Sequence, residues 1–122
     1  MMVKDDYDVI LCKLLIYLYA ILKRKTVYND VEFDKTVRRN VNEDYFTDVL
    51  RLAQEEGLIR GVITTKVWGG SYILLSSPAD LEITPAGIRY LKENSTAQKA
   101  LKVIIDTADI FASLASAIGL HI

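Results

Sequence analysis

The sequence has 122 residues, enough for one ordinary domain with its own core and too few for two independent ones. Its 51% hydrophobic and 25% charged residues exclude a disordered chain, and the apolar surplus favours self-association. With 15 basic and 16 acidic residues the formal net charge is −1, which excludes the general positive excess of a dedicated nucleic-acid binder, so any basic patch must be local.

The compartment can be inferred from cysteine content and from apolar runs. Cys12 is the only cysteine, so no intramolecular disulfide can form, and the first residues lack the pattern of a secretory signal. The apolar run from Val9 to Leu22 is interrupted only by Lys13, but it is shorter than the roughly 20 residues that a membrane span requires. We expect a cytoplasmic protein that does not cross a membrane.

The first predicted helix begins near Asp5 and ends near the basic residues 23–25, so the charges at both ends suit the helix dipole. Its middle is apolar nearly all round, which means that it must be covered on more than one side. We expect it to pack against the domain core and against the C-terminal helix, either its own or a partner's.

Residues 26–41 give the weakest pattern. TVYNDVEF is compatible with a short strand, and DKTVRRN with one or two helical turns. In a winged helix the short second helix lies here and supports the helix that follows.

The stretch from Asn42 to Arg60 predicts a helix that leads directly into a strand. Asn42 is a good N-cap, acids fill the first turn, and Gly57 suits the left-handed conformation that ends many helices. Between these ends apolar residues recur at helical spacing on one side. A helix, a glycine stop and a β-rich run form the centre of a winged helix-turn-helix domain.

From Leu58 onward the pattern is that of a β-hairpin, the wing. LIRGVITTKV is rich in β-branched residues, WGGS is turn-forming, and YILLSS is the second strand. Pro78 ends that strand because it cannot donate to the ladder, and residues 80–83 lead into the next helix. That helix has Thr84 as its cap and Pro85 at its first position.

The last predicted helix begins at a capping box in which Ser95 caps Gln98, and an apolar heptad seam follows. We expect residues 1–94 to form the winged-helix domain and residues 95–122 a C-terminal helix that makes a homodimer. The alternative is that the first helix covers this seam within one chain, and both can hold together. The candidate dimer interface is Leu101, Ile104, Ala108, Phe111, Leu114, Ala115 and Ile118.

Three segments carry a family resemblance. They are DYF at 44–46 with Leu50 and Leu52, EGLIRGV at 56–62, and ITPAGIRYLKENS at 83–95. With them the chain resembles the YjcQ-like family of small bacterial and prophage proteins. The resemblance implies an α+β winged-helix fold and a prokaryotic or phage setting. It assigns no site residues, because the family has no established activity.

DNA binding needs basic or hydrogen-bonding side chains on the helix that enters the groove, because phosphates repel acids. Residues 43–56 instead carry five acids and one base, for a formal charge of −4. Other bases could meet phosphates if they share a face, but for any single cluster we prefer an ordinary surface role. The candidate nucleic-acid contacts are Lys23, Arg24, Lys25, Lys35, Arg38, Arg39, Arg51, Arg60 and Lys66.

Trp68 is the only tryptophan and falls at the predicted wing tip. Exposed aromatic side chains are enriched at interfaces, so Trp68 is a candidate contact, with Tyr72 as its companion. The alternative is that Trp68 folds back over the hairpin.

The sequence offers no catalytic residues, no metal ligands and no cofactor-binding motif. His121 has no partner near it in sequence, Cys12 lies in the most apolar helix, and Asp106 with Asp109 would be too few ligands for a metal. Neither GxGxxG nor GxxxxGK occurs.

We therefore expect a non-enzymatic winged-helix regulatory module that acts as a homodimer, with DNA as a candidate partner. The alternative is a protein-interaction module that uses the wing near Trp68 or the acidic face of the 43–56 helix.

Overall fold

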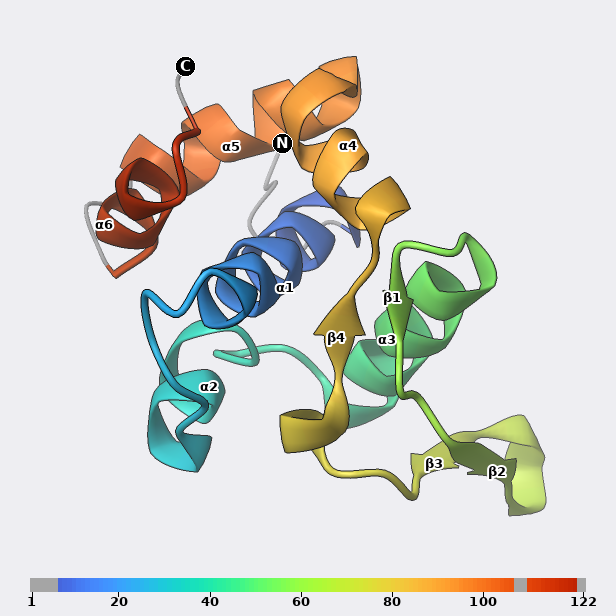
Figure 1. The fold of residues 1–122 in the computed structure, drawn as a ribbon. Coiled ribbons are helices and arrows are strands. Elements are labelled where there is room, and N and C mark those ends of the chain that lie inside the picture. Colours follow the sequence, from blue (N-terminus) through green and yellow to red (C-terminus); the bar gives the residue numbers. More distant parts are fainter. Residues whose placement is uncertain (1–6, 107–109, 121–122) are drawn as a thin grey trace.

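Helix α1 (Tyr7–Leu22) runs through the middle of the computed structural model, which describes residues 7–106 and 110–120 (Figure 1). From Val9 to Ala20 every residue except Lys13 is buried. Helices α3, α4, α5 and α6 and strand β4 all pack against α1. The expectation that this apolar helix is covered on several sides is confirmed.

Helix α1 ends at Leu22, slightly before the basic residues that we expected to close it. Arg24 adopts a left-handed conformation with φ 63°, and the N–H of Lys25 donates to the carbonyl oxygen of Ala20 at 2.8 Å. The chain therefore turns away from the helix here, and the three basic residues lie exposed on the turn.

Helix α2 (Asp30–Thr36) occupies part of the segment in which a strand seemed possible, so the strand interpretation of TVYNDVEF is wrong. The side chain of Asn29 caps the helix by accepting from the N–H of Glu32 at 2.9 Å. Phe33 is fully buried and its ring packs against those of Tyr17 and Phe46. Burial of this one phenylalanine anchors a helix too short to be stable alone.

Helix α3 (Glu43–Glu55) has the ends that its sequence predicts. Asn42 Oδ1 accepts from the N–H of Tyr45 at 3.1 Å, and Gly57 has a φ of 78°. Phe46, Val49, Leu50 and Ala53 form its buried face.

Two short antiparallel sheets follow. Strand β1 (Ile59–Arg60) pairs with β4 (Glu82–Ile83), and β2 (Thr64–Lys66) pairs with β3 (Tyr72–Leu74). The continuous strands that we expected over 58–67 and 72–77 are therefore each shorter and interrupted. Gly61 causes the first break: its φ is 96°, and a side chain there would collide with the backbone carbonyl of Asp80. Residues 80–83, expected only as a connection, supply β4.

The helix order α1–α2–α3, followed by paired strands, gives a winged-helix-like α+β fold. Two short 3₁₀ segments, η1 (Trp68–Gly70) and η2 (Pro78–Asp80), connect the strands. Figure 1 shows β2 and β3 projecting from the body beside α3, as a wing does.

Helices α4 (Pro85–Glu93) and α5 (Ser95–Asp106) meet at a tight corner. Thr84 caps α4 as expected, accepting from the N–H of Gly87 at 3.0 Å. The expected capping box of α5 is wrong, because Asn94 rather than Ser95 is the cap and accepts from the N–H of Ala97 at 3.0 Å. The side chain of Gln98 instead donates to the carbonyl oxygen of Leu91 at 2.9 Å, which ties α5 to the end of α4.

Helices α5 and α6 (Ile110–Ala117) cover α1, and they share one hydrophobic core with α1 and α3. The segment from residue 95 that we expected to be an appendage thus packs as part of the same core. The seam residues are covered within the chain, as in the alternative in which the first helix packs on the seam. Leu101, Ile104, Phe111, Leu114, Ala115 and Ile118 are all buried within the chain, and Ala108 lies outside the described residues.

Replacing Phe111 with Asp should destabilise the folded chain itself. Phe111 is fully buried and Lys13 Nζ lies 5.6 Å from its ring centroid, so the change removes a large apolar side chain and buries a charge. We expect a loss of at least about 3–5 kcal/mol in the free energy of unfolding, measured in urea. Ser113→Asp, on the exposed side of α6, is the control. Equal stability of the two variants would contradict this packing.

Candidate interaction surface

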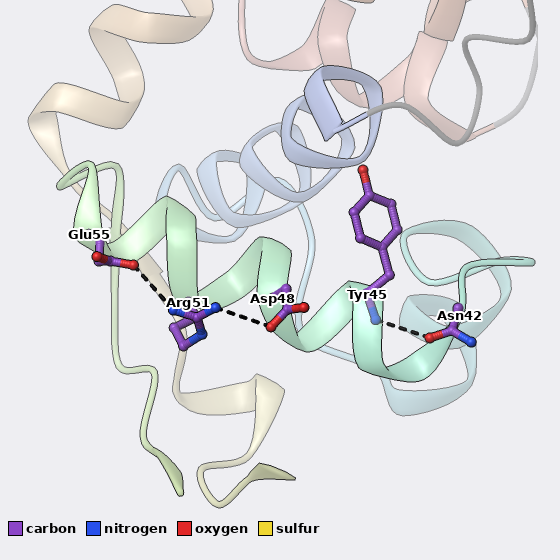
Figure 2. A network of polar contacts seen from close by, with 5 residues as sticks. All are labelled: Asn42, Tyr45, Asp48, Arg51 and Glu55. Atoms are coloured by element: carbon purple, nitrogen blue, oxygen red, sulfur yellow. Dashed lines mark hydrogen bonds and ion pairs between the residues drawn. The ribbon is translucent and has the colours of Figure 1, made fainter. Parts of the chain in front are cut away.

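The only base on α3 is already engaged by its neighbours (Figure 2). Arg51 Nη2 lies 3.3 Å from Asp48 Oδ1, and Nη1 lies 3.4 Å from Glu55 Oε2. Its guanidinium also stacks over the ring of Tyr72 on β3, 4.2 Å from the centroid. Arg51 therefore fastens the wing to α3, and its charge is shared with two carboxylates.

The outward side of α3 is acidic. Glu43, Asp44 and Glu55 are exposed, and the partly exposed apolar residues Tyr45 and Leu52 lie among them. A phosphate backbone brought to this helix would meet carboxylates with no unpaired base on the same helix to offset them.

Three more of the candidate nucleic-acid contacts have partners inside the chain. Arg38 Nε is 3.8 Å from Asp34 Oδ1, Arg60 Nε is 3.2 Å from Glu82 Oε1, and Lys23 Nζ donates to the carbonyl oxygen of Ile118 at 3.4 Å. The remaining candidates are exposed, and they lie on the turn after α1, on α2 and its following turn, and on β2. They are Arg24, Lys25, Lys35, Arg39 and Lys66.

The structure brings few of these bases together. Arg24 and Arg60 line the same small pocket of about 170 Å³, but Glu82 lines it too. On α2, Lys35 shares its short helix with Asp30 and Asp34. Carboxylates thus accompany the bases at these two places.

Trp68 at the wing tip is fully exposed, with a relative accessibility of 100%. The interpretation in which it folds back over the hairpin is wrong. Tyr72 is no companion to it, because the strand register sets Tyr72 opposite Lys66 and its ring lies beneath Arg51.

One face of the wing is apolar and open. Ile63, Ile73 and Leu75 are 60%, 50% and 62% exposed. Ile73 and Leu75 share a face because side chains alternate along a strand. Ile63 lies on the same face because it is opposite Leu75, whose N–H donates to the Ile63 carbonyl oxygen at 2.7 Å. The opposite face, with Tyr72 and Leu74, packs toward α3. We call Ile63, Ile73 and Leu75, with Trp68 at the tip, the wing face.

Sequence reasoning found Trp68 but missed the aliphatic residues of the wing face. The signal was present in YILL, where neighbouring apolar residues must point to opposite sides of a strand. A hairpin that is apolar on both sides and packs one side against a helix leaves the other side uncovered.

A groove of about 480 Å³ lies beside the wing, between the first half of α3 and strand β3. Glu43, Asp44 and Thr47 line one wall, and residues 72–74 line the other. The groove and the wing face thus border the same strand.

Chemistry at a metal or a thiol finds little support in the described residues. Within 7–106 and 110–120 no group of three His, Cys, Asp or Glu side chains could hold a metal ion, and Asp109 and His121 lie outside those ranges.

None of the described helices has the length and apolar character needed to cross a membrane. Cys12 is buried, and burial, aided by Asp8, raises the pKa of its thiol to about 12.

Cys12 should therefore resist alkylation in the folded protein. Because the reactive species is the thiolate, a pKa near 12 leaves almost none at pH 8, and the rate should rise only toward that pKa or on unfolding. Iodoacetamide labelling followed by mass spectrometry should modify an exposed thiol introduced by Ser116→Cys well before Cys12. Labelling of both at one rate in the native state would contradict the burial of Cys12.

The family model described as YjcQ protein matches residues 13–110, from within α1 to the first residue of α6. A search of curated proteins and a search of solved structures each found no match.

Proposed function

The chain belongs to the YjcQ family, and from the surface that its fold presents we propose that it is a non-enzymatic module which binds a partner protein through the wing face. The observation that carries this proposal is one hairpin with three aliphatic residues at least half exposed, Ile63, Ile73 and Leu75, and the fully exposed Trp68 at its tip. Isolated apolar residues are common on protein surfaces, but three of them on one face of a hairpin that also carries an exposed tryptophan favour a binding role, because tryptophan is enriched at interfaces.

The stability of the fold does not require these side chains to be apolar. Ile63, Ile73 and Leu75 turn away from α3, and Trp68 contributes no burial at all. Polar residues would serve equally well at these positions in an isolated hairpin, since exposed apolar strands favour aggregation. A partner protein that covers the wing face would explain why apolar residues occupy these exposed positions.

Electrostatics favours a protein over DNA as that partner. The helix in the position of a reader helix carries a formal charge of −4 over residues 43–56, and Arg51, its one base, is held by Asp48 and Glu55. Entry of this helix into a groove would place carboxylates near phosphates.

A DNA-binding regulator is the second candidate. The winged-helix-like order of elements favours it, together with the exposed bases Lys35, Arg39 and Lys66. In this case the wing would contact phosphates through Lys66.

A homodimer, if formed, must use a surface other than the buried seam of α5 and α6. The wing face is one such surface, and light scattering would then give a doubled mass that Ile73→Ser lowers.

Protein contact at the wing tip can be tested by cross-linking in cells. We expect a photo-reactive amino acid placed at Trp68 to give discrete protein adducts, identified by mass spectrometry, because this side chain projects fully from the wing. The same amino acid at Lys99, exposed on α5, should give none of them. Equal adducts at both positions, or none at Trp68, would count against the proposal.

Two serine substitutions distinguish the wing face from α3 as the contact surface. Ile73→Ser should reduce adduct yield at Trp68 by about tenfold or more, since burying one aliphatic side chain is worth roughly 1.5–3 kcal/mol. Leu52→Ser, an equally apolar exposed site on α3, should leave the yield nearly unchanged. The reverse pattern would assign the contact to α3 instead.

DNA binding is tested by fluorescence polarisation with random and upstream-region duplexes at about 50 and 200 mM salt. We expect no binding tighter than the roughly 10⁻⁴ M of weak non-specific association, even at the lower salt. Binding that is tight at low salt, falls steeply with added salt and weakens in Lys66→Ala would establish the second candidate.

A further inference from the structure

Strand β3 has one unpaired edge. In an antiparallel pair, alternate residues direct both backbone groups toward the partner strand, and the residues between direct theirs away. Thr65 is paired with Ile73, Leu75 N–H donates to the carbonyl oxygen of Ile63 at 2.7 Å, and Val67 N–H donates to that of Ser71 at 2.9 Å. The backbone groups of residues 71, 73 and 75 therefore point toward β2. The N–H and C=O groups of Tyr72 and Leu74 therefore point outward.

Those outward groups have no other backbone partner in the part of the chain that the structure describes. The sheet of β2 and β3 contains these two strands alone in the described ranges, and no turn or loop bond reaches Tyr72 or Leu74. Free N–H and C=O groups on an edge strand are a template for a further strand.

The groove beside α3 runs along this edge. Tyr72, Ile73 and Leu74 all line it, and because successive strand residues point to opposite faces, a groove that touches all three touches the strand from its side. Its volume of about 480 Å³ lies within the range of roughly 300–1,000 Å³ typical of ligand pockets. Pro78, which is partly exposed, adds apolar surface for a side chain of an extended occupant.

The charge of the groove selects the occupant. Glu43 and Asp44 on the α3 wall are exposed, and no salt bridge ties either carboxylate to a base within the described residues. Arg38 also lines the groove, but it pairs with Asp34 and stacks over the ring of Phe46 at 5.2 Å. The groove thus favours a basic side chain and disfavours a phosphate backbone.

We propose that an extended segment of the partner protein docks on β3 as a third strand of the wing sheet, with a lysine or arginine directed at Glu43 and Asp44. The groove borders the wing face, so one partner can cover both. This inference rests on the proposed function, because it takes the partner to be a protein and states how its main chain is recognised.

The experiment selects peptide ligands directly, so the partner need not be identified first. A displayed library of random nine-residue peptides is selected on the intact wild-type chain and, in parallel, on Glu43→Gln/Asp44→Asn. We expect enriched peptides that combine lysine or arginine with alternating apolar residues and bind the double variant about tenfold more weakly. Glu93→Gln/Asp106→Asn, which removes two exposed charges from α4 and α5, should bind as the wild type does.

A second readout separates strand pairing from simple charge attraction. Titration of the most enriched peptide, followed by ¹H–¹⁵N NMR, should shift the amide signals of Tyr72 and Leu74. The same peptide with alternate backbone nitrogens methylated should lose binding, because it cannot pair on that edge.

The inference is overturned if no peptide is enriched, if the methylated peptide binds equally, or if the double variant selects the same peptides at the same strength. Cross-linked protein adducts at Trp68 that persist alongside any of these results would leave the proposed function intact and reject only the strand-pairing mode. Loss of those adducts as well would reject both.

Discussion

The fold depends on the all-round burial of α1. A helix that is apolar on every side must be covered on every side, and here α3, α4, α5, α6 and β4 provide the cover. The apolar seam of α5 and α6 packs against α1, which is why Phe111 and Ile118 are buried within the chain. The consequence for function is indirect: with the seam covered inside the chain, the wing face is an apolar surface that the described residues leave uncovered.

A second constraint joins the wing to the body. The two terminal nitrogens of Arg51 meet Asp48 and Glu55 (Figure 2). Its guanidinium also stacks on Tyr72, so the side chain that would most naturally read DNA from α3 is used to hold the hairpin. The arrangement turns α3 into a support. It presents the outer face of the hairpin, and the free edge of β3, to whatever binds there.

Sequence reasoning succeeded where the signal is local and failed where it depends on distant residues. The caps at Asn42 and Thr84 and the stop at Gly57 were predicted because each acts within a few residues. Strand β4 was missed because only its pairing with Ile59 makes it a strand. The cap of α5 moved to Asn94 because Gln98 is drawn to the carbonyl of Leu91, a contact that exists only once α4 and α5 meet. Likewise the heptad seam was predicted correctly as apolar, but periodicity cannot say whether its cover comes from the same chain or another.

The central claim is that the wing face meets a protein, and the single tryptophan gives it a direct reporter. In protein labelled with 5-fluorotryptophan, the ¹⁹F resonance reports Trp68 alone. We predict that this resonance shifts when clarified lysate of the organism that encodes the chain is added. The shift should survive nuclease treatment of the lysate and disappear when the lysate proteins are digested and the protease quenched before mixing. A resonance that never moves, or a shift that nuclease abolishes, would contradict it.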